Sequence, residues 1–381
     1  MTERACLVAT AAPPYGARPK VSARRFIAPN ASVPKAMSVD LTTFAPLLIQ
    51  WQRQHGRHDL PWQKSLQPYP VWLSEIMLQQ TQVSTVKAYF ERFLSRWPRV
   101  QDLAAAELDE VMGLWSGLGY YSRARMLHRC AQTVVHEHAG HFPSDMAALQ
   151  KLPGIGPSTA AAIASLCFGQ AVSIMDGNVR RVLTRLLAFD EDLALSSAQK
   201  NLNHHAQALL PSGRWVKSMP QYTQGLMDLG ATVCHSRQPA CEQCPMRAMC
   251  QGHASGAPTA FPRKTRKLVR RSQAWWLLLL RSPEGGVWLR KRPAQGIWAG
   301  LYGPPVFDSE DLAFQSIPTA LHRQVALSTP FVHVLTHRDL HLHPLRLAVP
   351  ASTTWGEGQW WPADAWPPLG LPAPLRRLLS E

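Results

Sequence analysis

The chain has 381 residues, and 46% apolar content with fourteen tryptophans is enough to bury two hydrophobic cores. Forty Lys and Arg against twenty-five Asp and Glu give a net charge of +15, with an isoelectric point near 9.9. This charge favours a polyanionic partner. The longest apolar run, from Ala274 to Leu280, is too short to span a membrane. We therefore expect a soluble protein of two domains in a reducing compartment, the bacterial cytoplasm with its nucleoid.

Residues 1–36 are predicted to be a disordered extension. They contain five prolines, many alanines and one acid, Glu3, and they show neither a helical nor a strand period. An Arg-rich, acid-poor start is also typical of organellar targeting segments. Translation starting at Met37 would remove the segment altogether, so targeting and a misassigned start both stay open.

A helical domain is predicted for residues 37–250. From Leu41 to about Cys250 apolar residues recur every three or four positions, as they do along the buried face of a helix. Glycine and proline separate these runs, and no alternating strand pattern interrupts them. The first domain should therefore be mostly α.

Residues 251–273 are predicted to be a basic linker, and residues 274–381 a smaller α+β domain. The linker is rich in Arg and Lys from residue 263 onward. Short Trp-, Val- and Leu-rich runs separated by turns then predict strands over Ala274–Arg281, Gly286–Arg290 and Val332–Thr336.

Four cysteines within seventeen residues form a predicted metal cradle with the spacing C-x6-C-x2-C-x5-C. Structural zinc sites usually combine two close pairs, whereas here only Cys241 and Cys244 form one. A winding loop with unevenly spaced thiolates suits a [4Fe–4S] cluster better. The predicted ligands are Cys234, Cys241, Cys244 and Cys250. Disulfides are the alternative, but nothing else in the chain is typical of a secreted protein.

The segment Leu152–Ile163 begins Leu-Pro-Gly-Ile-Gly and continues into an Ala-rich helix. A glycine turn that opens a helix leaves backbone N–H groups free to bind phosphate. This is the helix-hairpin-helix pattern, which grips the DNA backbone without reading bases. The residues expected at the backbone are Gly154, Gly156, Ser158 and Thr159.

Two carboxylates stand in settings that suit complementary roles. Glu75 lies in a predicted helix, Val71–Val83, among bulky apolar residues, so desolvation should raise its pKa and make it a proton donor. Asp176 is the predicted N-cap of a helix beginning near Val179, where the helix dipole should hold it as an anion. A proton donor and a cation stabiliser together suit cleavage of a glycosidic bond.

Five ordered motifs together resemble the adenine DNA glycosylases of the MutY family, from about residue 41 to the end. They are Trp72–Val83, Gly117–Arg125, Leu152–Gly156, Met175–Val179 and the cysteine loop. The resemblance implies a helix-hairpin-helix glycosylase fold with one [4Fe–4S] cluster. It also implies removal of adenine mispaired with 8-oxoguanine or guanine in double-stranded DNA, by a protein that we expect to be a monomer.

The resemblance also implies roles for single residues. Glu75 would protonate adenine, Asp176 would stabilise the oxocarbenium ion and Asn178 would lie beside it. Leu60, Trp62 and Gln224 would belong to the adenine pocket. The residues that invade the duplex and meet the lesion would be Gln80, Thr81, Leu118 and Tyr120. For Tyr120, packing in the core beside Tyr121 is the alternative.

The second domain resembles the family's Nudix-related C-terminal domain. A Nudix hydrolase needs a Glu-rich helix for Mg²⁺, and Val306–Gln324 has only Glu310 and Asp311, so recognition is favoured over hydrolysis. Leu335, Thr336 and His337 align with the Phe-Ser-His that contacts 8-oxoguanine in relatives, with two of the three positions changed.

Three other functions are weighed against adenine excision. An endonuclease-III-like glycosylase and lyase would carry a Schiff-base Lys where this chain has Ser158, and it would lack the second domain. A non-catalytic iron–sulfur DNA-binding protein would use the hairpin without Glu75 or Asp176. A zinc module with a Nudix hydrolase fits least, because the metal-binding helix is missing.

Overall fold

The computed structural model describes residues 41–265 and 269–381. The predicted extension over residues 1–36, and the alternative start at Met37, lie outside the described residues. None of the helices in the described part is long and apolar enough to cross a membrane.

All regular elements within residues 41–265 are helices, as the periodicity predicted. The α-helices are α1 (Phe44–His55), α2 (Pro68–Leu78), α3 (Val83–Arg96), α4 (Val100–Ala104), α5 (Leu108–Leu114), α6 (Ser122–Glu137), α7 (Met146–Leu149), α8 (Pro157–Phe168), α9 (Gly177–Leu186), α10 (Ser196–Ala208), α11 (Met219–Thr232) and α12 (Gln251–Ala254). The 3-10 turns are η1 (Pro61–Gln63), η2 (Gly213–Ser218), η3 (Cys241–Gln243), η4 (Arg247–Met249) and η5 (Pro258–Ala260).

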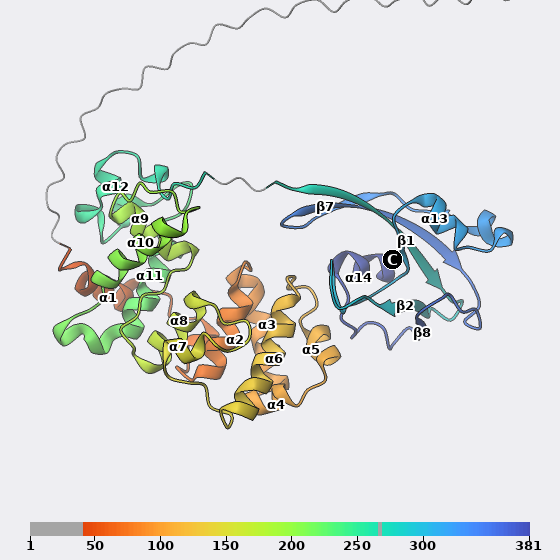
Figure 1. Ribbon diagram of the computed structural model, residues 1–381, viewed down its shortest axis with the longest axis horizontal. Coiled ribbons are helices and arrows are strands. Elements are labelled where there is room, and N and C mark those ends of the chain that lie inside the picture. Colours follow the sequence, from red (N-terminus) through yellow and green to blue (C-terminus); the bar gives the residue numbers. More distant parts are fainter. Residues whose placement is uncertain (1–40, 266–268) are drawn as a thin grey trace, which may run out of the picture. The chain divides into compact units, whose positions relative to one another are not determined.

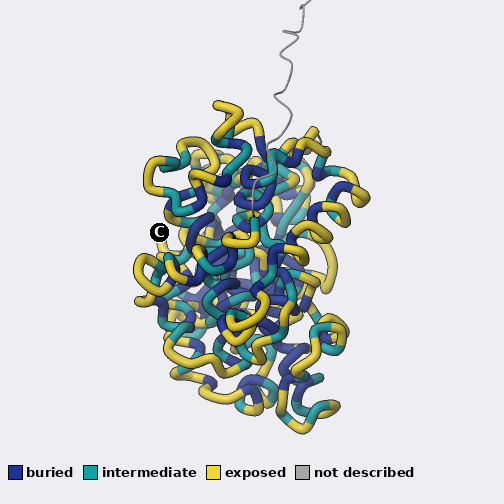
Figure 2. The backbone as a smooth tube through the Cα atoms, turned by 90° about the vertical axis from the view of Figure 1, so that its left-hand side faces the viewer, coloured by how far each residue is buried: buried dark blue, intermediate teal, exposed yellow. Residues whose placement is uncertain are grey.

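Helix α8 is the buried centre of this part. Every residue from Thr159 to Leu166 is buried, and four of them are alanines whose small side chains let neighbouring helices approach closely. Helix α8 packs against α2, α7 and α11, and α11 packs in turn against α1 and α9 (Figure 1). Figure 2 shows buried and exposed residues alternating along the chain, as amphipathic helices require.

The predicted helix over Val71–Val83 is wrong as a single element. Helix α2 ends at Leu78 and α3 begins at Val83. Between them Gln80 has a positive φ of 58°, which a non-glycine residue rarely adopts and which no helix continues through. The break leaves Glu75 on α2 and places Gln80 and Thr81 in a turn.

The second part contains one sheet with the path β3-β2-β1-β7-β5. The strands are β1 (Arg271–Arg281), β2 (Val287–Lys291), β3 (Tyr302–Gly303), β4 (Val306–Phe307), β5 (Ala326–Leu327), β6 (Phe331–Val334), β7 (Arg338–Ala348) and β8 (Gln359–Trp361). Strands β1 and β7 run parallel over their full length, from Arg271 opposite Arg338 to Arg281 opposite Ala348 (Figure 1). Helix α13 (Glu310–Gln315), the 3-10 turn η6 (Thr319–Gln324) and helix α14 (Ala373–Ser380) complete this part.

The three strands expected from the sequence correspond to β1, β2 and β6, whereas β7 was missed. Strand β7 contains Pro344, which cannot donate a ladder hydrogen bond and normally argues against a strand. Its burial also changes face there, because Leu340 and Leu342 are followed by buried Pro344 and Leu345. The alternation that identifies a strand is therefore broken in the middle.

Residues 251–265 carry α12 and η5, although the sequence assigned them to a linker. Their backbone bonds back to the helical part: Leu193 donates to the carbonyl of Arg263, and the Arg185 guanidinium donates to that of Phe261. Helix α13 forms where a Nudix hydrolase would need its metal helix, and it carries only Glu310 and Asp311 in its first turn.

Candidate active site and cysteine pocket

A cavity among η1, α2, α8 and α11 brings together several residues that the sequence singled out. Glu75 lies in its wall, together with Leu60, Trp62 and Gln224. Leu60 and Trp62 are buried, and the Trp62 ring meets Phe90 edge to face at 5.5 Å between centroids. We call this cavity the base pocket. Its walls are mostly apolar with few polar groups, as in most small-ligand sites.

Glu75 has the raised pKa that its neighbours predicted. Burial is the main cause and the negative charge of Asp176 adds to it, so the pKa of Glu75 rises to about 8. The carboxyl therefore carries its proton at neutral pH. The influence of Asp176 also shows that the two acids, about one hundred residues apart in the sequence, share one electrostatic environment.

Asp176 caps α9 as predicted: the N–H of Val179 donates to its Oδ1 at 2.7 Å. The expected lowering of its pKa by the helix start is present and nearby Arg181 and Arg180 add to it, but burial outweighs both, and the pKa of Asp176 is raised. The sequence prediction considered the helix dipole and could not include the desolvation that comes from folding.

Asn178 is fixed between α9 and α11. The Arg181 guanidinium donates to Asn178 Oδ1 at 2.8 Å, to the carbonyl of Gly230 at 2.7 Å and to the carbonyl of Cys234 at 2.8 Å. A Cβ added at Gly230 would lie only 2.7 Å from the Asn178 Cβ, so glycine is required for this close approach. Arg181 thus connects the catalytic candidates to the start of the cysteine loop.

Asp228, which the sequence analysis did not select, is a buried acid that bonds to Arg57 and Gln224, two residues in the wall of the base pocket. Its carboxylate accepts from Arg57 Nε at 2.8 Å, from the Arg57 backbone N–H at 3.0 Å and from Gln224 Nε2 at 2.8 Å. A carboxylate can only accept, so the Gln224 amide must turn its NH₂ toward Asp228. The signal in the sequence was an isolated acid inside an otherwise apolar stretch, Gly225–Gly230.

Gln63, in the wall of the base pocket, is the second residue that the sequence analysis missed. Both polar atoms of its amide are buried and have no hydrogen-bond partner. Buried polar groups in native proteins are nearly always paired, so an unpaired amide in a pocket wall points to a ligand. Nothing in the local sequence distinguishes Gln63 from a surface glutamine.

The two hairpin glycines differ in their backbone conformation. Gly154 has φ of 75°, whereas Gly156 has φ of −84° and ψ of 174°, an extended conformation open to any residue. A Cβ at Gly156 would meet no atom within 4 Å, so the space in front of Gly156 is open to the DNA backbone expected there. Ser158 is partly exposed at the start of α8, while the buried Thr159 hydroxyl accepts from Gln79 Nε2 at 3.4 Å.

Besides the turn with Gln80 and Thr81, two turns carry residues that the sequence analysis expected to contact DNA. Tyr120 is 43% exposed with φ of 48°, so it does not pack in the core, unlike its buried neighbour Tyr121. Leu118 is buried beside it. In the turn between β6 and β7, Thr336 is partly exposed and His337 exposed, and the hydroxyls of Tyr120 and Thr336 lie 2.9 Å apart. Leu335 closes that turn by donating its N–H to the carbonyl of Arg338.

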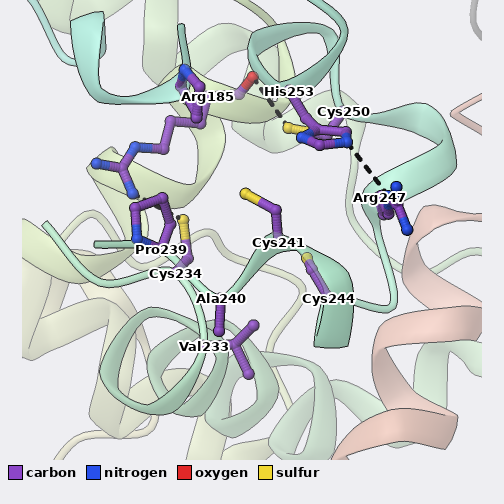
Figure 3. A pocket seen from close by; sticks show the side chains of 11 residues that line it. Arg185, Val233, Cys234, Pro239, Ala240, Cys241, Cys244, Arg247, Cys250 and His253 are labelled. Atoms are coloured by element: carbon purple, nitrogen blue, oxygen red, sulfur yellow. Dashed lines mark hydrogen bonds between the residues drawn. The ribbon is translucent and has the colours of Figure 1, made fainter. Parts of the chain in front are cut away.

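The four predicted metal ligands line one pocket, with their sulfur atoms around a common space (Figure 3). Arg185 is buried at its side and donates to Cys234 Sγ at 3.3 Å and to the carbonyls of His235 and Ser236. Among the described residues, no group of three or more His, Cys, Asp or Glu is arranged to hold a single metal ion. The donor chemistry of four thiols around one space fits an iron–sulfur cluster.

Comparison with known proteins agrees with both parts of the chain. Residues 73–211 match the HhH-GPD superfamily of base excision DNA repair proteins, and residues 276–381 match the NUDIX domain. An adenine DNA glycosylase of Buchnera aphidicola is 32% identical over 89% of this chain and 97% of its own, and that of Rattus norvegicus is 35% identical over 84% and 74%. The structure of a thermostable thymine-DNA glycosylase, 27% identical, superimposes with a TM-score of 0.50 over 56% of this chain and 97% of its own. The chain belongs to the adenine DNA glycosylase family.

Proposed function

We propose that the protein hydrolyses the N-glycosidic bond of adenine mispaired with 8-oxoguanine or guanine in double-stranded DNA, without cutting the strand. The observation that carries the proposal is Glu75, a carboxyl with a pKa of about 8 in the wall of an apolar pocket. A protonated acid there can donate to a base nitrogen and so turn adenine into a neutral leaving group.

Asp176 supplies the second half of the proposed reaction. As the bond to the base breaks, positive charge develops on the sugar, and a nearby carboxylate stabilises it. The backbone N–H of Val179 and the charges of Arg180 and Arg181 favour the ionised form of Asp176, although burial outweighs them and raises its pKa. Water then completes the hydrolysis.

Two amides support adenine as the base. The NH₂ group of Gln224 donates a hydrogen bond to Asp228, which leaves the Gln224 carbonyl oxygen free to accept a hydrogen bond from a base in the pocket. Adenine offers its N6 amino group as a donor to such an acceptor, whereas guanine presents the O6 acceptor and is repelled. The unpaired Gln63 amide offers one donor and one acceptor, and a glutamine amide pairs with adenine in this two-point way.

The proposed absence of strand cleavage rests on Ser158. A lyase needs an amine that forms a Schiff base with the sugar, and the position after the hairpin carries a hydroxyl. A serine hydroxyl cannot form a Schiff base, so water is the nucleophile that attacks the sugar.

We assign Cys234, Cys241, Cys244 and Cys250 as the ligands of one [4Fe–4S] cluster. The cluster would supply a rigid covalent centre to a loop that otherwise has only short 3-10 turns. The Arg185 and Arg181 hydrogen bonds hold the backbone at Cys234 in place for this role.

The partner base is proposed to be read by the turn that carries Thr336 and His337. Both side chains can form a hydrogen bond with a lesion base, and Thr336 already meets the Tyr120 hydroxyl of the helical part. The proposed lesion contact therefore joins residues from both parts of the chain.

A duplex with a single adenine opposite 8-oxoguanine tests the proposal. We expect free adenine under single-turnover conditions, with a strand break that appears only after alkali. The same duplex with thymine opposite adenine is the matched control and should release none. Failure to release adenine from both the 8-oxoguanine and the guanine mispair would overturn the proposal, and a break without alkali would show a lyase.

A further inference from the structure

Arg123, the second residue of α6, is a buried cation that the proposed chemistry does not use. Its guanidinium donates to six acceptors, five backbone carbonyls and one hydroxyl. These acceptors belong to two segments about forty residues apart in the sequence. The side chain therefore connects two turns that are not neighbours in the sequence.

The first segment is the end of α2 and the turn that follows it. Arg123 Nη1 donates to the carbonyls of Ile76 at 2.9 Å and Met77 at 2.8 Å, and also to that of Gln79. The last carbonyls of a helix lack partners within the helix and carry the negative end of its dipole, so a cation is favoured there. Glu75 is the residue directly before Ile76.

The second segment is the turn before α6. Arg123 Nη2 donates to the carbonyls of Leu118 at 3.3 Å and Gly119 at 3.2 Å. The same nitrogen donates to the Thr81 hydroxyl at 3.1 Å in the first turn. The planar guanidinium fork thus holds both turns at once, which the single ammonium of a lysine cannot do in the same geometry.

Each turn contains a residue in a costly backbone conformation. Gln80 has φ of 58° and Tyr120 has φ of 48°, and for residues other than glycine this region is sparsely populated. Such conformations persist only where the surroundings impose them. The Arg123 hydrogen bonds flank Gln80 on both sides and end next to Tyr120.

None of the recorded acceptors of Arg123 is a carboxylate, and burial lowers its pKa to about 10, so it stays a cation at neutral pH. The Trp115 and Tyr120 rings lie 5.2 and 5.3 Å from its guanidinium carbon and stabilise that charge. The two terminal nitrogens of this buried charge bond mainly to backbone carbonyls, while its Nε has no partner, and these bonds fix the backbone to which they are made.

We infer that Arg123 is a positioning residue that locks the Gln79–Thr81 and Leu118–Tyr120 turns into one rigid wedge and sets that wedge in register with Glu75. The inference rests on the proposed function, because it takes these turns as the part that enters DNA and Glu75 as the proton donor. Base extrusion and proton delivery are then coupled through one side chain.

The test compares Arg123→Lys and Arg123→Met with Arg129→Lys, an exposed arginine on the same helix. Each holoenzyme is examined for its melting temperature, its affinity for an uncleavable duplex, its single-turnover adenine release and the fluorescence of 2-aminopurine placed beside the target adenine. The fluorescence reports extrusion and does not require excision.

We expect Arg123→Lys to keep most of the stability that Arg123→Met loses, because lysine keeps the positive charge. Lysine does not keep the planar guanidinium fork that holds both turns. Its extrusion signal should stay low and its release rate should fall about 100-fold, as a small misplacement of catalytic groups does. Duplex affinity should change less than about threefold. Extrusion and release that recover in proportion to the melting temperature would overturn the inference.

A second variant keeps the question answerable if both Arg123 variants unfold. Thr81→Val removes a single acceptor of the fork and leaves the five carbonyls in place. It should lower extrusion and release together at unchanged stability, and unchanged extrusion would contradict the coupling. Failure of the wild-type protein to release adenine would instead defeat the proposed function, while the extrusion measurements would still report on Arg123.

Discussion

The base pocket and the cysteine pocket both adjoin helix α11, but their polar groups are satisfied in opposite ways. Helix α9 has Asp176 at its start and Arg185 near its end, and α11 carries Gln224 and is followed by Cys234. In the base pocket Gln63 is unpaired and Glu75 is desolvated. In the cysteine pocket the Arg185 guanidinium is paired with backbone carbonyls and a thiol.

This contrast separates reactivity from rigidity. Groups kept unpaired or desolvated cost stability in the free protein and are available to a substrate. Groups paired with backbone hold a loop in place and add no chemistry. Substitutions in the base pocket should therefore change rates more than stability, and substitutions in the cysteine pocket should do the reverse.

Replacing Glu75 with Gln should give the largest change in rate. Gln cannot donate the proton, so we expect single-turnover adenine release to fall about 10³- to 10⁴-fold while duplex affinity stays within a few-fold. Wild-type release should decline as pH rises through about 8, where Glu75 loses its proton. Glu91→Gln, an exposed acid on α3, is the control and should retain the wild-type rate.

The same variant should be more stable than the wild type. Folded Glu75 has a pKa of about 8 against an ordinary value of 4.5, so between these values the folded state keeps a proton that the unfolded state releases. Wild-type stability from this group is therefore fully present below pH 4.5 and declines up to pH 8. The melting temperature of Glu75→Gln should exceed the wild-type value by a margin that widens over this range, and a constant margin would contradict the raised pKa.

Replacing Cys241 with Ser in the cysteine pocket should lower stability more than it changes the chemistry. Loss of one thiolate should remove the cluster and loosen the loop, because metal affinity at such sites is partly folding energy. We expect loss of iron and sulfide, a lower melting temperature and duplex binding at least about tenfold weaker. Cys130→Ala removes a buried thiol outside the pocket and should keep its iron. An iron-free Cys241→Ser protein with normal binding would refute the structural role.

Only some residues of the two pockets could be predicted from the sequence. Glu75, Asp176 and the four cysteines could be selected as candidates because each stands in a compact local pattern. Asp228 and Gln63 were not, because their roles depend on contacts between α11, the end of α1 and η1 that only the fold creates. The raised pKa of Asp176 was missed for the same reason, since burial is a property of the assembled helices.

Asp228→Asn tests whether amide orientation sets the choice of base. An Asn at this position can donate as well as accept, so the Gln224 amide is no longer forced to turn its oxygen into the pocket. We expect release of adenine to fall about tenfold relative to release of purine, which lacks the N6 amino group. Unlike Gln63 and Glu75, Asp228 is paired, so stability should also drop by about 3 kcal/mol, because Arg57 loses its buried partner. Equal losses on both bases would leave Asp228 with only a structural role.

Thr336→Ala should produce the smallest effect, and it extends the comparison to the second part of the chain. The Thr336 hydroxyl is partly exposed and already lies 2.9 Å from that of Tyr120, so its loss removes one hydrogen bond of modest net value, about 1 kcal/mol. If this hydroxyl reads the lesion, single-turnover release should slow about fivefold opposite 8-oxoguanine and hardly change opposite guanine. Thr354→Ala, an exposed threonine in the same part, should change neither rate. Equal slowing on both duplexes would mean that Thr336 only supports Tyr120, and recognition of the lesion would then depend on the helical part.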